Sequence, residues 1–134
     1  MHDSFAFRVV TPRQMLLDEH VREVTAPGTL GEFGVLPDHI AFLTALETGS
    51  LTYRTDRGTR RVALRGGFAE VADNVMTILA DDAVFAEDID AAGARADLQR
   101  AEATLHDLSP LDDAYPAADA ARRWAHARLA AAAH

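Results

Sequence analysis

Cysteine is absent from this sequence of 134 residues, and so are long apolar runs. Without cysteine there is no disulfide bond, no thiolate nucleophile and no zinc ribbon. No apolar run approaches the roughly 20 residues that span a bilayer, so we expect no membrane-spanning helix. The first ten residues have neither a basic region nor an apolar stretch, and no export signal is expected. These absences favour a soluble protein that reaches a membrane only through a partner.

Lysine is also absent, and all 13 basic residues are arginines. With 21 acidic residues, the chain has a formal net charge of −8. A chain this acidic is repelled by phosphate backbones and by anionic lipids. Nucleic acids and membrane surfaces are therefore unfavourable partners. Hydrophobic residues make up 49% of the chain, which is enough at this length for a packed core.

Catalytic motifs are lacking as well. The histidines show no metal-ligand spacing, and neither HExxH nor GxSxG occurs. Paired carboxylates at Asp81-Asp82, Glu87-Asp88 and Asp112-Asp113 fall at the ends of expected elements, where acids cap helices or solvate turns. We therefore expect neither a metal site nor a catalytic site.

The composition changes near Glu87, and the part before it predicts an antiparallel β-sandwich or barrel. This part is rich in Val, Phe, Thr, Leu and Gly, with turn signals at intervals of about ten residues. Phe5 to Val9 alternate between apolar and polar positions, as in a half-buried strand, and Asp73-Asn74 predicts a two-residue turn. A second strand with an internal bulge or kink is expected over Met15–Ala26. Further strands are expected at Gly34–Leu36, Ala41–Leu46, Gly49–Thr55, Arg60–Arg65, Phe68–Ala72, Val75–Ala80 and Val84–Ala86.

The part after Glu87 is rich in alanine and predicts two helices in an antiparallel hairpin. Asp88 or Asp90 can cap the first helix, Ser109-Pro110 ends it, and the second helix begins around Pro116. An alanine contributes only about 0.8 kcal/mol per buried carbon, so a hairpin held this lightly could dock, undock or extend. The expected buried stripes are Ala94, Leu98, Ala101 and Leu105 in the first helix, and Ala118, Ala121, Ala125, Leu129 and Ala132 in the second.

The least generic segment runs from Gly31 to His39 and reads GEFGVLPDH. It places two carboxylates and an imidazole on turns bounded by glycine and proline. The ordinary interpretation is a solvated loop, and the alternative is a recognition loop. Glycines at Gly28, Gly31 and Gly34 do not indicate a phosphate loop, because no Lys-Ser/Thr follows them and the local charge is negative.

Several motifs in order resemble the epsilon subunit of bacterial F-type ATP synthases. They cover almost the whole chain: Val9-Val10-Thr11-Pro12, Val24-Thr25-Ala26-Pro27-Gly28, the Gly31–His39 segment, Gly66-Gly67-Phe68-Ala69-Glu70-Val71 and Ala86-Glu87-Asp88-Ile89-Asp90. The resemblance implies a mainly β fold with an α tail. An N-terminal antiparallel β-sandwich of about ten strands would occupy residues 1–86, and a two-helix antiparallel hairpin residues 87–134.

The resemblance also implies a function. The chain would be a non-catalytic subunit of the central rotor stalk, bound to the gamma subunit and seated on the ring of c-subunits, peripheral to the cytoplasmic face of a bacterial cell membrane. The family's Glu and His of the GEFGxLPxH motif face the c-ring, which assigns docking to Glu32 and His39. Asp38 joins this set, although the family usually has glycine at its position.

The family's helical tail implies regulation. It can extend toward the alpha and beta subunits and oppose ATP hydrolysis, and in some members the folded hairpin binds ATP through an I/L-D-x-x-R-A motif. Asp90 matches that motif and Arg100 matches a later arginine, but Gly93 stands at the motif arginine and Trp124 at another arginine position. Asp90 and Arg100 are therefore expected to be a vestigial nucleotide site, and no cofactor is expected.

Two alternatives to a stalk subunit remain open at this point. One is a small-ligand-binding sandwich whose hairpin closes over a nucleotide. The other is an enzyme of unassigned class, although no nucleophile, base and orienting residue can be named together.

Overall fold

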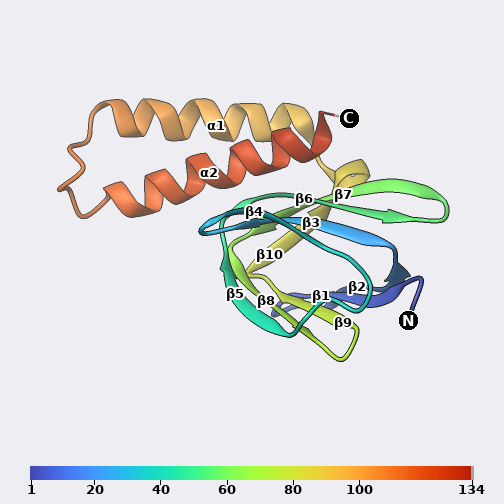
Figure 1. The fold of residues 1–134 in the computed structure, drawn as a ribbon. Coiled ribbons are helices and arrows are strands. Elements are labelled where there is room, and N and C mark those ends of the chain that lie inside the picture. Colours follow the sequence, from blue (N-terminus) through green and yellow to red (C-terminus); the bar gives the residue numbers. More distant parts are fainter. Residues whose placement is uncertain (134) are drawn as a thin grey trace.

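The chain forms a β-sandwich followed by two antiparallel helices that lie together on one side of it, as Figure 1 shows for the computed structural model, which describes residues 1–133. None of the helices within residues 1–133 is long and apolar enough to cross a membrane. The elements are β1 (Phe5–Val10), β2 (Met15–Val21), β3 (Glu23–Gly28), β4 (Gly31–Val35), β5 (Phe42–Leu46), β6 (Gly49–Thr55), β7 (Gly58–Arg65), β8 (Gly67–Ala72), β9 (Val75–Leu79), β10 (Asp82–Phe85), the 3-10 helix η1 (Ala86–Asp88), α1 (Ala91–His106) and α2 (Tyr115–Ala132).

The strands follow one hydrogen-bonded order, β10-β7-β6-β3-β5-β8-β9-β1-β2, with β4 paired to β3. A single bridge between Gly28 and Leu46 joins β3 to β5, and the order folds there into two layers around the core (Figure 1). We call β10, β7, β6, β3 and β4 the helix-side sheet. We call β5, β8, β9, β1 and β2 the far sheet.

The strands do not all run antiparallel. β1 and β9 pair in parallel, with Phe7 opposite Met76 and Val9 opposite Ile78, whereas the other pairs are antiparallel. The expected β-sandwich of about ten strands is confirmed, and this one parallel pair departs from the antiparallel pairing that was expected. Turn signals fix the direction of consecutive strands, but they do not determine which strands distant in the chain become neighbours.

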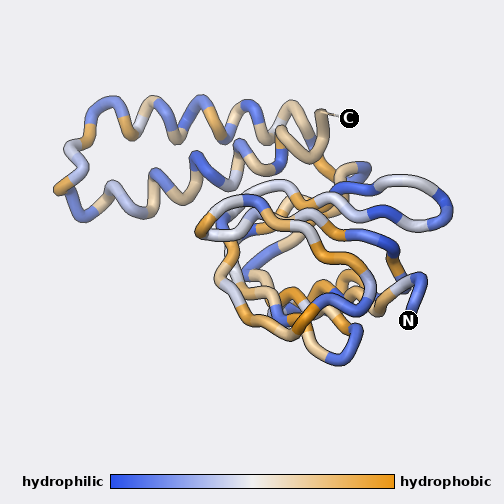
Figure 2. The backbone as a smooth tube through the Cα atoms, viewed as in Figure 1, coloured by the Kyte–Doolittle hydropathy of each residue, from blue (hydrophilic) through white to orange (hydrophobic). Residues whose placement is uncertain are grey.

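The predicted alternation accounts for the core. Phe5, Phe7 and Val9 of β1 are at most 1% exposed, and they pack with inward-facing residues of both sheets. Figure 2 shows apolar residues concentrated along the sandwich strands, while apolar and polar residues alternate along both helices. The hydrophobic core therefore lies within the sandwich, and the helices are an addition to its outside.

The strand boundaries confirm part of the sequence prediction. The expected kink within Met15–Ala26 falls at Arg22, where β2 ends and β3 begins. Asp73 and Asn74 have φ values of 52° and 61°, which confirms the two-residue turn between β8 and β9. The strand expected at Gly34–Leu36 was placed wrongly, because β4 already starts at Gly31. Gly31 pairs with Gly28, the last residue of β3.

The tail is the predicted helical hairpin, with Asp90 as the N-cap of α1. The Asp90 carboxylate accepts a hydrogen bond from the backbone N–H of Gly93 at 3.1 Å, which satisfies one of the free donors at the helix start. Pro116 lies in the first turn of α2, where its missing N–H costs nothing. Helix α2 packs against α1 on one side and against β6 and β7 on the other.

The buried stripes were predicted in part. Ala94, Ala101, Ala118 and Ala125 are buried as expected, but Ala121 is exposed. A second buried stripe on α2, Ala127 and Ala131, was missed, because the prediction assumed only one partner for this helix. Its partner in the sandwich includes Ala63 of β7, which is fully buried although it points away from the core side of its strand.

Candidate docking surfaces

Glu32 and His39 lie at the end of the sandwich where β4 leads into β5, and both line a shallow hollow of about 350 Å³. Phe33 and Phe42 form part of the hollow and meet edge to face at 5.5 Å between ring centroids. The His39 ring lies 5.0 Å from the Phe42 ring, and its Nδ1 donates to the carbonyl oxygen of Ile40 at 2.8 Å. The exposed carboxylate of Glu32 therefore stands beside aromatic surface.

Three aliphatic side chains surround this end of the sandwich, and the sequence prediction did not include them. Leu30 is fully exposed in the β3–β4 turn, and Ile40 and Leu36 are 79% and 54% exposed in the connection to β5. Exposed apolar groups at one end of a sandwich indicate a contact surface. The signal in the sequence was Leu30 itself, an apolar residue at the tip of a glycine-bounded turn.

Asp38 does not line the hollow, although it precedes His39. Its backbone N–H donates to the Asn74 side-chain oxygen at 2.8 Å, and its carboxylate accepts the His2 backbone N–H at 2.7 Å. His2 Nδ1 lies 2.6 Å from the same carboxylate. The backbone donor of His2, followed by its imidazole, holds the pKa of Asp38 below its ordinary value. Asp38 is thus tied to the amino-terminus and not to Glu32 or His39.

The backbone at Asp38 has a conformation that favours glycine. Its φ is 65°, a left-handed conformation that glycine adopts freely and aspartate tolerates. This chain therefore keeps the loop conformation and adds a carboxylate that fastens the loop to His2.

A row of apolar side chains crosses the outer face of the far sheet. Phe68, Leu79 and Met15 are each 55 to 56% exposed. Cross-strand pairing aligns the row: Ala45 with Phe68, Phe68 with Leu79, Leu79 with Val10, and Val10 with Met15. We call these five residues the apolar row. Contiguous exposed apolar surface of this kind marks a protein interaction site.

The apolar row was missed at the level of sequence because its members belong to different strands. Ala69 and Val71 face the core, so Phe68 occupies a position where strand alternation predicts a polar residue. That departure was the available signal. A hollow of about 420 Å³ overlies the row and is lined by Phe68, Leu79 and the Thr11-Pro12 bend.

The structure does not bring Asp90 and Arg100 together. They are ten positions apart on the same helix, about 15 Å along its axis. Asp90 caps α1, and a Cβ added at Gly93 would lie 2.5 Å from its carboxylate oxygen. Arg100 pairs instead with Asp97, about one turn earlier in α1.

Between the two helices lies a groove of about 510 Å³ that includes Arg100, Trp124 and Arg128. Arg128 donates to the Asp97 carboxylate at 3.0 Å, and its guanidinium carbon lies 5.3 Å from the centre of the Trp124 ring. Asp97 therefore accepts from arginines of both helices. The two hairpin arginines of this groove are thus engaged within the hairpin, while Arg65 of β7 also lines it.

The comparisons with known proteins agree with this architecture. The model of the ATP synthase, Delta/Epsilon chain, beta-sandwich domain matches residues 4–86. An ATP synthase epsilon chain of Nitratidesulfovibrio vulgaris is 47% identical over 129 residues, covering 96% of each chain. The epsilon chain of Geobacter sulfurreducens is 43% identical, covering 96% of this chain and 94% of that one.

Solved structures extend the similarity to both parts of the chain. A chain in the mitochondrial ATP synthase of Euglena gracilis, in an assembly of OSCP, F1 and c-ring, superposes with a TM-score of 0.84 at 27% identity, covering all of this chain and 84% of that one. The matched sandwich, the relatives of equal length and this superposition give one result: the chain belongs to the epsilon-chain family of ATP synthases, a family of non-catalytic subunits.

Proposed function

We propose that the chain joins the gamma subunit to the ring of c-subunits in the central stalk of a bacterial ATP synthase. The observation that carries this proposal is the presence of two separate exposed surfaces on one rigid sandwich. The apolar row lies across the far sheet, and the hollow of Glu32 and His39 lies at the end of the sandwich. A subunit that transmits torque needs two such attachments on a body that does not deform.

The apolar row suits the gamma subunit as its partner. A coupling subunit must stay bound through every rotation, and apolar burial supplies lasting affinity that salt does not screen. Phe68 and Leu79 lie side by side in the row, and each is more than half exposed.

The hollow of Glu32 and His39 suits the polar loops of the c-ring. A carboxylate beside an aromatic floor binds a partner side chain with a polar or cationic head and an apolar stem. The exposed Leu30 and Ile40 at its rim add apolar contact around that polar centre. The sandwich would then sit on the ring, and through it at the cytoplasmic face of the cell membrane.

The hairpin is free to act as a regulator because it covers neither surface. Helix α2 lies against β6 and β7 of the helix-side sheet, while the apolar row is on the far sheet (Figure 1). The tail can leave the sandwich without releasing gamma or the ring. It could then reach the alpha and beta subunits and oppose ATP hydrolysis, which would be its regulatory role.

The test is a co-purification. The full chain should be recovered with gamma from a mixture of purified ATP synthase subunits, and a truncation after Glu87 should assemble normally while changing the ATPase rate. A chain that fails to bind gamma would contradict the proposal.

A further inference from the structure

A second row of side chains runs beside the apolar row on the outer face of the far sheet. Cross-strand pairing aligns Leu43 with Glu70, Glu70 with Thr77, Thr77 with Arg8, and Arg8 with Asp18. We call these residues the mixed row. On β5, β8, β9 and β1 the two rows are two positions apart, which puts them on one face of the sheet at a separation of about 7 Å. A partner that covers the apolar row therefore also meets the mixed row.

Glu70 is an exposed carboxylate among apolar side chains. Its neighbours in β8, Ala69 and Val71, belong to the core, so Glu70 points outward, where it is exposed. Leu43 lies directly opposite on β5 and is 69% exposed, and Phe68 stands on the same face of β8. Side chains directly opposite each other have Cβ atoms about 5 Å apart. The carboxylate is thus bordered by apolar surface on two sides.

The Glu70 carboxylate has no counter-charge within residues 1–133. None of the ion pairs formed there includes it. The arginine of the mixed row, Arg8, pairs with Asp18 at 3.4 Å, and Thr77 stands between Arg8 and Glu70. The two charges at one end of the row therefore compensate each other, and Glu70 is left uncompensated at the other end.

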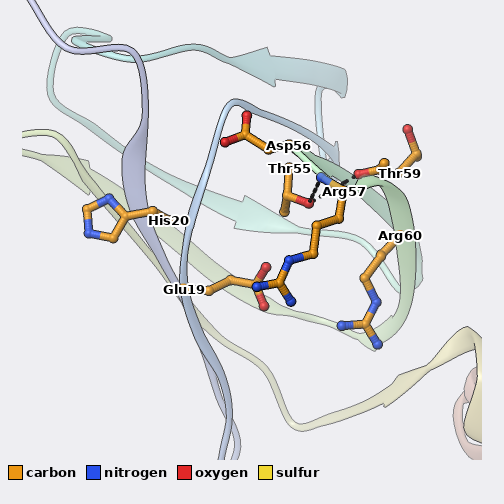
Figure 3. A pocket seen from close by; sticks show the side chains of 8 residues that line it. Glu19, His20, Thr55, Asp56, Arg57, Thr59 and Arg60 are labelled. Atoms are coloured by element: carbon orange, nitrogen blue, oxygen red, sulfur yellow. Dashed lines mark hydrogen bonds between the residues drawn. The ribbon is translucent and has the colours of Figure 1, made fainter.

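The other carboxylates on strands show how unusual this is. Ion pairs with arginines of this chain are formed by Asp18, Glu23 and Asp82. Glu19 shares a hollow of about 410 Å³ with Arg57 and Arg60, and Figure 3 shows these side chains around it. Within residues 1–133, the strand carboxylates that remain without an arginine are Glu32 and Glu70. Glu32 already belongs to the hollow proposed for the c-ring, so the absence of an internal cation coincides with a contact surface there.

Covering the far sheet with a partner would remove water from Glu70. A carboxylate that enters an apolar contact loses its hydration, which is unfavourable unless a cation or several donors replace the water. The apolar row favours covering this face, and Glu70 opposes it unless the partner brings a positive charge. Both conditions are met by a partner surface that is apolar opposite Phe68 and Leu79 and cationic opposite Glu70. The net charge of −8 attracts such a partner from a distance.

We propose that Glu70 is a specificity-determining residue of the gamma contact and receives a lysine or arginine side chain of gamma. The aliphatic stem of that side chain lies along Leu43 and Phe68, and its charged head reaches the carboxylate. The apolar row then supplies most of the affinity, while the charge pair selects the partner and fixes how it is aligned. This inference rests on the proposed assignment of the apolar row to gamma and extends that surface to β5.

The test is isothermal titration of purified gamma with the full chain and its variants. We expect Glu70→Gln to weaken gamma binding about tenfold, because the variant loses a charge-assisted contact. We expect Glu70→Lys to weaken it by about a hundredfold, because two like charges would then be buried together. Urea unfolding of both variants should match the natural chain, since Glu70 is exposed and its replacement leaves the core unchanged.

The matched controls are Glu102→Gln and Glu102→Lys. Glu102 is exposed on α1, on the opposite side of the sandwich from the far sheet (Figure 1), and its replacement makes the same changes in net charge. Gamma affinity should stay within about twofold in both controls. The proposal is overturned if Glu70→Gln binds gamma as tightly as the natural chain, or if the Glu70 and Glu102 variants lose affinity equally. A natural chain that does not bind gamma at all would instead overturn the stalk assignment, so the two failures are distinct.

Discussion

Phe68 of β8 lies directly opposite Leu79 of β9 on the outer face of the far sheet, and each residue is more than half exposed. Pairs of large apolar side chains are costly to leave in water. The strands hold this pair without any help from the helices. Its exposure is therefore a property of the rigid part of the molecule, ready for a partner.

Replacing Leu79 by aspartate should weaken binding to the gamma subunit about 30-fold, because a buried leucine contributes about 2 kcal/mol to such a contact. Isothermal titration of purified gamma with each variant measures the change. The matched control is Leu111→Asp, since Leu111 is 93% exposed at the tip of the hairpin and far from the row. Equal losses in both variants would contradict the assignment of the row to gamma.

Replacing Glu32 by glutamine should weaken attachment to the c-ring while leaving gamma binding unchanged. The carboxylate supplies a charge-assisted contact worth about 1.5 kcal/mol, so the expected loss is about tenfold. Binding of the gamma–epsilon pair to isolated c-rings measures it. Asp38→Gly is the informative comparison: it removes a carboxylate from the neighbouring loop but keeps the left-handed backbone, and we expect no loss of ring binding.

The sequence predicted local structure better than long-range structure, for physical reasons. Alternation and turn residues such as Asp73-Asn74 act within a few residues of the chain, and the structure confirms them. The parallel pairing of β1 with β9 and the alignment of Phe68 with Leu79 depend on strands that meet only after folding. No short pattern encodes those pairings.

The candidate docking residues show the same contrast between local and long-range features. Glu32 and His39 were predicted through the family motif, and they do line one hollow. The attachment of Asp38 to His2 was not predicted, because the two residues are 36 positions apart.

Replacing Ala63 by leucine should undock the hairpin and leave the sandwich folded. Ala63 is fully buried although it is not part of the sandwich core, and its strand β7 packs against α2, so added carbons there have no space without separating helix from sheet. We expect faster hydrogen exchange in α2 and an unchanged rate in β1 and β9. Ala72→Leu is a suitable control, since Ala72 is partly exposed on the far sheet. Unchanged protection of α2 would show that this contact does not hold the tail.

Replacing Gly67 by alanine should destabilise the whole sandwich by more than about 2 kcal/mol. The φ of Gly67 is 117°, and a Cβ there would lie 2.0 Å from the Leu79 carbonyl oxygen. Backbone must move to admit it, whereas the same change at Gly34 meets no atom nearer than 3.9 Å and no unfavourable φ. Urea unfolding of both variants gives the comparison. A Gly67 variant as stable as the Gly34 variant would contradict the expected clash.

Titration of the full chain with magnesium and ATP should produce no binding heat at millimolar nucleotide. Arg128 and Arg100 already pair with Asp97, and Gly93 supplies no cation beside Asp90, so a phosphate between the helices would have to displace Asp97 to gain a charge-assisted contact with either arginine. Gly93→Arg adds such a cation, with only the movable Asp90 side chain in its way. Asp97→Asn releases the two arginines. We expect the double variant, Gly93→Arg with Asp97→Asn, to bind ATP and the natural chain not to bind it. Binding heat from the natural chain would contradict this prediction and support a nucleotide-binding tail.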